Sequence, residues 1–364
     1  MSKTYKIGII GCGGIANGKH LPSLSKLNNV ELVAFCDIVT ERAEAAAEKY
    51  GAEGAKVYED YTELLKDASI DVIHVLTPNE SHARISIAAL EADKHVMCEK
   101  PMAKTAAEAR QMVEAAKKSG KKLTIGYNNR FRPDSQHLKR VCEDGGLGNI
   151  YYAKAHAIRR RAVPTWGVFL DEEKQGGGPL IDIGTHALDL TLWMMDNYKP
   201  KVVLGTKYHE LSQRENAANA WGPWDPSKFK VEDSAFGMIV MENGATVTLE
   251  SSWALNTLDV HEAKCTLSGS EAGADMKDGL RINGEEFSRL YTKEAELSSG
   301  GVAFYAGNVE SDSDLEAYRW IEAIDQDLEP TVTPEQACVV SEILEAIYES
   351  ARTGKAVYMN GAEA

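Results

Sequence analysis

The sequence predicts an α/β protein in which a doubly wound parallel sheet is followed by a second α/β domain with a mostly antiparallel sheet. Up to residue 126, apolar runs of strand length alternate with helical patterns, as in parallel sheets covered by helices. After residue 131, strand patterns follow one another without helices between them, which favours antiparallel pairing. We therefore expect domains at residues 1–128 and 129–364, with the C-terminal helices packing back onto the fold.

The elements of the first domain follow from hydrophobic periodicity. Short apolar runs bounded by turn residues predict strands, and apolar residues spaced by three or four predict helices. The strands are expected at 6–10, 31–36, 57–58, 72–76, 95–98 and 123–126, and the helices at 40–50, 81–92 and 105–119.

The second domain begins with a helical pattern and an alternating strand pattern. A sheet of this kind can bury its second face against another copy, so we expect a homodimer or homotetramer. The elements are a helix at 136–142, strands at 151–161, 202–208, 235–241, 245–252 and 263–268, and helices at 314–325 and 334–352. Asn243 and Gly244 predict a hairpin turn, and Gly354 is a helix stop signal.

Composition argues against several classes of protein. The 364 residues carry a net charge of -15, which argues against nucleic acid or an anionic membrane as partner. No apolar run approaches the roughly 20 residues of a membrane span, and the N-terminus shows no signal-peptide pattern. Six scattered cysteines without metal-ligand spacing predict reduced, mostly buried thiols, a cytoplasmic protein and no metal site.

The turn after the first strand, GCGGIA at residues 11–16, is a GxGxxA variant of the dinucleotide fingerprint. Gly11, Gly13 and Gly14 allow a tight turn and close approach of the backbone to a pyrophosphate. Ile15 lies at the start of the following helix, whose free N–H groups stabilise the phosphate charge.

Asp37 ends the second strand, where a carboxylate would accept both ribose hydroxyls of NAD. Its charge would repel the 2′-phosphate of NADP, so we expect NAD as the cofactor. Arg42 lies close enough in sequence to be a further cofactor contact. A helix-capping role is the alternative for Asp37.

Two later strand ends lie at the same edge of the predicted sheet, where ligands bind in doubly wound folds. After the fourth strand we expect Thr77, Pro78, Asn79 and His82 near the cofactor. For Asn79 a helix cap is an equally good interpretation, and His82 would lie in a first helical turn at the surface.

The tripeptide Glu99-Lys100-Pro101 follows the fifth strand. A lysine at the mouth of a parallel sheet is expected to point toward the cofactor, and a salt bridge to Glu99 is the alternative. Because Lys100 has to leave the sheet and turn within one residue, its bond to Pro101 is a candidate for the cis form.

The chemistry is expected in residues 176–190, GGGPLIDIGTHALDL. Three glycines and a proline ahead of a helical run are a helix start signal. Asp182 and His186 lie four residues apart on one helix face, so the carboxylate can hold the imidazole in one tautomer and raise its basicity. Gly184 would let a flat ligand approach the backbone. A buried helix whose polar residues bond only to one another would give the same pattern.

With these motifs in order, the sequence resembles the Gfo/Idh/MocA family of NAD(P)-dependent oxidoreductases over nearly its whole length. The resemblance rests on the GCGGIA turn, the Glu-Lys-Pro tripeptide, GYNNRF at 126–131, and GGGPLIDIGTHALDL. It implies a Rossmann domain, then an α/β domain with an open, mostly antiparallel sheet, and a sugar or cyclitol as substrate. It also implies a catalytic set of Lys100, Asp182 and His186.

Two loops that contain tryptophan, at 161–167 and 219–230, are also expected to shape the substrate pocket, because C–H faces of sugars pack on indole rings. For Trp166, Trp221 and Trp224, core or interface positions are the alternative. Cofactor contacts are expected from Gly11, Gly13, Gly14, Ile15, Asp37, Arg42, Thr77, Pro78, Asn79, His82, Glu99, Lys100 and Asn128. Substrate contacts are expected from Lys100, Asn128, Arg130, Arg159, Trp166, Asp182 and His186. For Arg159, a strand position that faces solvent is the alternative.

Together these features predict an NAD-dependent dehydrogenase that oxidises a ring hydroxyl of a sugar, a sugar derivative or an inositol. His186, oriented by Asp182, is expected to act as general base and Lys100 to stabilise charge on the hydroxyl oxygen, although either could be the base. Both are expected to meet beside the nicotinamide, in a cleft between domains. An NAD-dependent glycosidase and a non-catalytic NAD-binding regulator are the alternatives.

Overall fold

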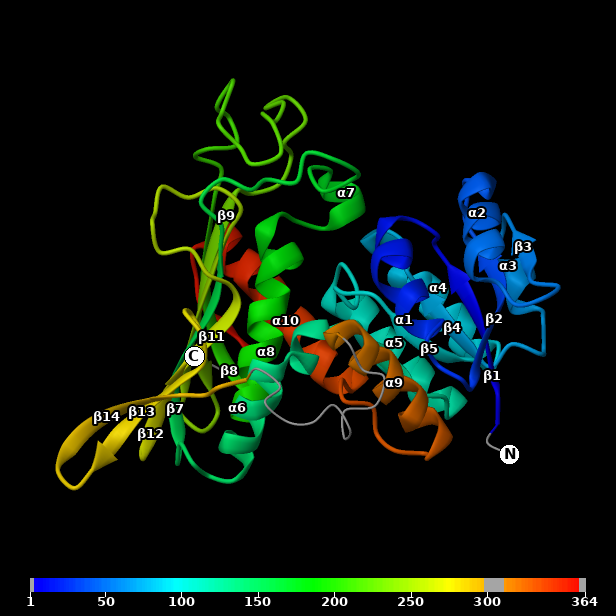
Figure 1. Cartoon of the computed structure of the whole chain (residues 1–364). Helices are drawn as coiled ribbons and strands as arrows, with labels where there is room; N and C mark the ends of the chain where they lie inside the picture. The colour runs from blue at the N-terminus through cyan, green and yellow to red at the C-terminus, as the bar shows by residue number, and fades with distance from the viewer. Residues whose placement is uncertain (1–2, 298–310, 360–364) are drawn as a thin grey trace. The chain divides into compact units, whose positions relative to one another are not determined.

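The computed structural model describes residues 3–297 and 311–359 (Figure 1). These residues form two compact units. The first contains the chain up to Phe131 together with residues 311–338, and the second contains residues 132–297 and 339–359. The predicted boundary at 128 lies close to the end of the first unit, and a C-terminal segment also belongs to that unit.

The first unit is built on a six-stranded parallel sheet with the order β3-β2-β1-β4-β5-β6. This is the doubly wound order, in which ligands bind beyond the carboxyl ends of the strands. The strands are β1 (Tyr5–Ile10), β2 (Val30–Cys36), β3 (Lys56–Tyr58), β4 (Val72–Val75), β5 (His95–Cys98) and β6 (Leu123–Ile125). The predicted parallel sheet is confirmed.

Helices of the first unit pack against this sheet. Trp320 and Ile321 of α9 lie in the same buried cluster as residues of β1 and β2, so part of the C-terminal chain completes the core of this unit. The helices are α1 (Leu21–Leu24), α2 (Thr40–Tyr50), α3 (Tyr61–Leu65), α4 (His82–Glu91), α5 (Ala106–Ser119) and α9 (Asp312–Asp325). At the start of α5, Thr105 and Glu108 form a reciprocal capping box.

The second unit contains a nine-stranded sheet with the order β14-β13-β12-β11-β7-β10-β9-β8-β15. Only β10 and β7 pair in parallel, so the predicted mostly antiparallel sheet is confirmed. The strands are β7 (Ile150–Ile158), β8 (Pro200–Tyr208), β9 (Ser234–Met241), β10 (Thr246–Ser252), β11 (Glu262–Gly269), β12 (Ala272–Asp275), β13 (Arg281–Glu286), β14 (Arg289–Glu294) and β15 (Val357–Tyr358). The sequence analysis did not predict β12 to β15.

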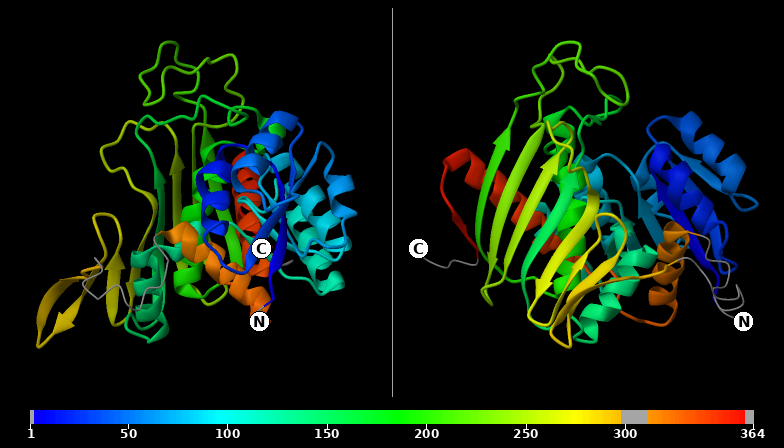
Figure 2. Two further views of the ribbon diagram at one scale, coloured as in Figure 1. Left: turned by 45° about the vertical axis from the view of Figure 1, so that its right-hand side comes forward. Right: turned by 60° about the vertical axis from the view of Figure 1, so that its left-hand side comes forward.

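One face of this sheet is covered by helices. These are α6 (Pro133–Glu143), α8 (Thr185–Met195) and the part of α10 (Pro334–Thr353) that belongs to this unit, and α7 (Glu172–Gln175) lies beyond the sheet (Figures 1 and 2). A Cβ on Gly237 of β9 would lie 2.5 Å from the Ile347 side chain, so α10 approaches the sheet closely. In the described part of the unit, no helix covers the opposite face.

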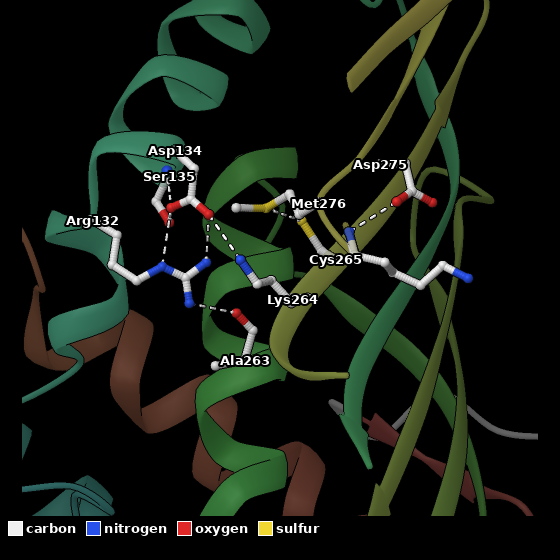
Figure 3. A network of polar contacts seen from close by, with 9 residues as sticks. Arg132, Asp134, Ser135, Ala263, Lys264, Cys265, Asp275 and Met276 are labelled. Carbon is white, nitrogen blue, oxygen red and sulfur yellow. Dashed lines mark hydrogen bonds and ion pairs between the residues drawn. The ribbon is translucent and has the colours of Figure 1, made fainter. Parts of the chain in front are cut away.

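A polar network fixes the start of α6 to β11 (Figure 3). Asp134 accepts hydrogen bonds from Arg132 (2.9 Å) and Lys264 (3.0 Å). Arg132 also donates to the carbonyl of Ala263 (2.9 Å), where the strand is irregular and φ is 51°. Burial raises the pKa of Asp134, but the two cations outweigh burial and hold the pKa below its ordinary value.

The six cysteines are free thiols, and all except Cys142 are buried. Burial, followed by the charge of Asp37, raises the pKa of Cys12 and of Cys36 to about 12, so both stay protonated at neutral pH. In residues 3–297 and 311–359, no helix has the length and apolar character needed to span a membrane. The same residues contain no cluster of three or more histidine, cysteine or acidic side chains suited to a metal ion.

Candidate functional site

The turn after β1 has the geometry that the fingerprint predicts. Gly11 has a φ of 96°, and an added Cβ would lie 2.6 Å from the carbonyl oxygen of Leu76, so only glycine fits. At Gly13 and Gly14, an added Cβ would meet no other atom within 4 Å. A phosphate can therefore approach the backbone there, ahead of the π-helical turn η1 (Ala16–His20).

Asp37 connects this turn to the end of β2. The buried carboxylate accepts backbone N–H bonds from Cys12 (2.8 Å) and, at the start of α2, from Val39 (2.9 Å). Because a carboxylate has about four lone-pair sites, Asp37 keeps capacity for ribose hydroxyls. Asp37 thus binds the backbone at the start of α2 and also lies where the predicted contact with the cofactor ribose requires a carboxylate. Arg42 is exposed in the first turn of α2.

The loop after β4 is held from inside the protein. Asn79 is buried and Pro78 is exposed. The His82 ring is buried, with its nitrogens 2.7 Å and 2.8 Å from the carbonyl oxygens of Pro101 and Thr77. The interpretation of His82 as a surface residue is therefore wrong. The His82 ring connects the loops after β4 and β5, so His82 would influence cofactor binding by holding these two loops in place.

Glu99 anchors the tripeptide after β5. Its buried carboxylate binds Lys19 (2.9 Å) and His20 (2.8 Å), and it accepts the backbone N–H of Lys100 (3.0 Å). Burial alone would raise the pKa of Glu99, but Lys19 and His20 outweigh burial and hold the pKa well below its ordinary value. Glu99 thus fixes the backbone that carries the half-buried Lys100. The bond between Lys100 and Pro101 is cis, as predicted.

Arg130 does not fit the predicted substrate role. Its side chain is fully buried, and the guanidinium donates to the carbonyl of Thr331 (2.8 Å) and to Gln336 (2.7 Å). Arg130 therefore links η3 (Asn128–Phe131) to the chain around the start of α10, and we do not include it in the substrate site. Asn128, on the same turn, is partly exposed and stays a candidate.

In the second unit, the glycine-led segment ahead of α8 is packed against the protein's own side chains. The Glu232 carboxylate accepts the N–H groups of Gly178 (2.9 Å) and Leu180 (3.2 Å). A Cβ on Gly177 would lie 2.1 Å from the Tyr348 hydroxyl oxygen, and one on Gly178 would lie 2.2 Å from the Glu232 carbonyl oxygen. Close packing therefore requires these glycines. Burial raises the pKa of Glu232, whereas the bonds from Gly178, Tyr348 and Leu180 favour its ionised form, which suits the positive end of the helix.

Asp182 and His186 lie on one helical run that begins as the π-helical turn η4 (Leu180–Gly184) and continues as α8. The sequence predicts a regular helix here, whereas the structure has a wider turn, a feature frequent at functional sites. Asp182 is buried and accepts a hydrogen bond from Trp253 Nε1 (3.0 Å), and His186 is partly exposed. Orientation of His186 by Asp182 stays a prediction.

Three residues that the sequence analysis missed hold this helix start: Glu232, Ser251 and Trp253. Ser251 donates to the carbonyl of Pro179 (2.8 Å), and a Cβ on Gly184 would lie 2.9 Å from Ser251 Oγ. Gly184 thus faces β10, which corrects the expectation that a flat ligand approaches there. The three residues lie 52 to 72 positions from their partners in the chain, so no local motif indicates them.

The tryptophan loops divide into exposed and buried parts. Trp166 and Trp221 contact each other at 4.9 Å between ring centroids, whereas Trp224 is buried and donates to a backbone carbonyl (2.9 Å). Arg159, just after β7, binds Glu262 through Nε (2.5 Å) and Nη2 (2.6 Å). Trp224 is therefore a core residue, while Trp166 and Trp221 stay available to a ligand.

Models of two protein-family domains match the chain. One, described as an oxidoreductase family with an NAD-binding Rossmann fold, matches residues 5–127, and the GFO/IDH/MocA C-terminal domain matches residues 135–275. The chain belongs to the Gfo/Idh/MocA family. Its first unit is accordingly an NAD-binding Rossmann domain of an oxidoreductase.

Individual relatives and solved structures extend the comparison. The D-glucoside 3-dehydrogenase of Escherichia coli (strain K12) is 36% identical over 360 residues, 98% of this chain and 98% of the relative. The inositol 2-dehydrogenase of Salmonella typhimurium is 36% identical over 199 residues, 54% of this chain and 56% of the relative. The crystal structure of aldose-aldose oxidoreductase from Caulobacter crescentus has a TM-score of 0.79 at 25% identity, covering 98% and 100% of the two chains. Levoglucosan dehydrogenase, solved with NADH and levoglucosan, shares the fold with a TM-score of 0.81 at 23% identity, with 98% and 100% coverage.

The predicted catalytic residues of this Gfo/Idh/MocA chain come from both units. Lys100 belongs to the first unit, as do the glycine turn and Asp37, whereas Asp182 and His186 belong to the second. Within the first unit, the N–H of Cys12 donates to the Asp37 carboxylate and so brings the turn and Asp37 together. Convergence of Lys100 and His186 on one substrate hydroxyl stays a prediction.

Proposed function

We propose that this protein is an NAD-dependent dehydrogenase that oxidises a ring hydroxyl of a sugar, a sugar derivative or an inositol. The observation that carries the proposal is that the chain contains both parts of such a site. A glycine turn with an approachable backbone lies beside Asp37, and a separate helical run carries His186 one turn after the buried Asp182. Similarity to a D-glucoside 3-dehydrogenase over 98% of both chains supports a sugar ring as substrate.

Each predicted catalytic residue has a separate task in this reaction. When bound, NAD supplies a hydride acceptor for the carbon that carries the hydroxyl. His186 takes the hydroxyl proton, so that the substrate loses one hydride and one proton and becomes a ketone. Asp182 orients the imidazole, and Lys100 stabilises negative charge on the oxygen. A base role for Lys100 is the alternative assignment.

The proposal includes a preference for NAD, a homo-oligomer and a cytoplasmic location. Asp37 supports NAD, because its charge disfavours a 2′-phosphate. Leu204 and Met238, paired across β8 and β9, are 49% and 46% exposed, which supports burial of the sheet's uncovered face against a second copy. Analytical ultracentrifugation of the purified protein measures its oligomeric state directly. The free thiols suit a reducing compartment.

A screen of sugars and inositols with NAD tests the proposed reaction. We expect steady formation of NADH, followed by its absorbance, with at least one compound. Release of a leaving group without net NADH would point to a glycosidase, and NADH formation with none of the compounds would contradict the proposal.

A further inference from the structure

Trp166 and Trp221 are the exposed members of the chain's six tryptophans. Their exposed fractions are 51% and 46%, whereas the other four are at most 9% exposed. The two rings meet edge to face, with an interplanar angle of 83°, and about half of each residue's surface stays exposed. Two indole rings that lie exposed side by side indicate a binding surface.

The loops that carry the two rings extend beyond the ends of β7 and β8 and are bound to each other (Figure 2). The Asn219 side chain accepts the N–H of Val163 (2.8 Å) and donates to the Val163 carbonyl (3.0 Å). Thr165 Oγ1 donates to the carbonyl of Trp221 (3.1 Å). Because these bonds hold the loops in place, a ligand can bind the exposed rings with little additional ordering.

A row of aromatic contacts connects this tryptophan pair to Asp182. Phe169 lies 5.9 Å from Trp166 and 6.4 Å from Trp253, measured between ring centroids, and Trp253 donates to Asp182. Phe169 and Trp253 therefore lie between Trp166 and Asp182, and Arg159 lies between Trp221 and Asp182. The pair is placed to contact a neighbouring part of the substrate, and not the ring that is oxidised.

Polar groups lie beside the aromatic surface. The Arg159 guanidinium is 5.6 Å from the Trp221 ring centroid and is held by both oxygens of Glu262. Burial lowers the pKa of Arg159, but Glu262 and Asp182 outweigh burial and raise it, so the guanidinium stays charged. Sugars need this combination, because their C–H faces pack on aromatic rings and their hydroxyls need charged or polar partners.

We propose that Trp166 and Trp221 form a subsite for a second sugar ring, so that the protein acts on disaccharides in preference to free monosaccharides. This inference rests on the proposed dehydrogenase function and specifies its substrate class. The second ring binds in the same way before and during the reaction, so the subsite is expected to lower KM and leave kcat nearly unchanged.

The test compares glucose with cellobiose and maltose as substrates for the wild type and for Trp166→Ala and Trp221→Ala. We expect wild type to favour at least one disaccharide over glucose in kcat/KM by about tenfold or more, the equivalent of ~1.4 kcal/mol. Each alanine variant should lose about that factor in kcat/KM for the disaccharide, mainly through KM, and should lose clearly less for glucose, which has no second ring to bind the subsite. Trp166→Phe and Trp221→Phe should keep most of the preference.

Phe287→Ala is the matched control, because Phe287 is 97% exposed and the β13–β14 turn that carries it lies at the other end of the sheet from the tryptophan loops (Figure 1). An equal loss of kcat/KM for glucose and disaccharide in the alanine variants, or no loss for either, would overturn the proposed subsite. A change of oligomeric state in both alanine variants would also overturn it and assign the pair to a contact between copies. If neither glucose nor the disaccharides yield NADH, disaccharide quenching of tryptophan fluorescence still tests the subsite: loss of quenching in the double alanine variant supports it, and absence of quenching in wild type contradicts it.

Discussion

Two helical runs of this protein start after glycines, and their N-termini have different partners. After β1, a Cβ on Gly13 or Gly14 would meet no other atom within 4 Å. Ahead of α8, a Cβ on Gly177 or Gly178 would lie 2.1 Å or 2.2 Å from its nearest neighbour, and Glu232 binds the N–H groups. Both runs begin with a π-helical turn.

The difference shows how one sequence signal serves two purposes. A helix N-terminus attracts negative charge, and the charge can come from a bound phosphate or from the protein itself. The approachable backbone after β1 suits a cofactor phosphate. The start of α8 already has the Glu232 carboxylate, so we expect this helix to position Asp182 and His186 and not to bind an anionic group of the substrate.

The largest expected effect comes from the second helix. If α8 carries the general base, His186→Ala should lower kcat by about 10²–10⁴-fold, because that is the usual contribution of acid–base assistance. NAD affinity, measured by calorimetric titration, should change little, since the cofactor turn lies in the first unit. Full turnover in this variant would make Lys100 the base and would leave α8 with a scaffold role.

The next effect tests how the first unit holds Lys100. Glu99→Gln should lower the free energy of unfolding by about 3 kcal/mol at neutral pH, because His20 loses its buried carboxylate partner and Lys19 keeps only Glu316. The folded-state pKa of Glu99 lies well below its ordinary value of 4.5, so this stabilisation is present above that pH and is lost as the pH falls. The free energies of unfolding of wild type and variant, measured with denaturant from neutral pH downward, should therefore converge as the pH falls.

Glu63→Gln is the control for that series, because Glu63 pairs with Lys66 at an exposed site. It should change stability by less than about 1 kcal/mol. A Glu99→Gln difference that stayed constant with pH would contradict the role of the charge.

A smaller effect tests the selectivity of the cofactor turn. Wild type should bind NAD more tightly than NADP, and Asp37→Ala should narrow the ratio of the two affinities by about tenfold. The ratio is informative because loss of the bonds to Cys12 and Val39 weakens the binding of NAD and of NADP alike. Equal or tighter binding of NADP by the wild type would contradict the assignment.

Local sequence patterns predict much of this fold because strands, helices and glycine turns are local structures. The parallel sheet, the fingerprint turn and the cis bond at Lys100 follow from residues that are neighbours in the chain. Partners that come from distant strands do not, and this is why Glu232 and Trp253 were missed. Burial was also misjudged: composition alone does not distinguish exposed Trp221 from buried Trp224 three residues later, nor does it show that Arg130 is fully buried.

The comparison of the two helix starts is tested most directly by measuring unfolding and NAD binding in Gly13→Ala and Gly178→Ala. Gly13→Ala should unfold within about 0.5 kcal/mol of wild type and bind NAD at least about tenfold more weakly, because its methyl group meets no protein atom and would occupy the cofactor's position. Gly178→Ala should lose about 1–3 kcal/mol of stability, because its methyl group collides with the Glu232 backbone, while the folded protein binds NAD as wild type does. A destabilised Gly13→Ala that keeps NAD affinity, or a stable Gly178→Ala, would contradict the account.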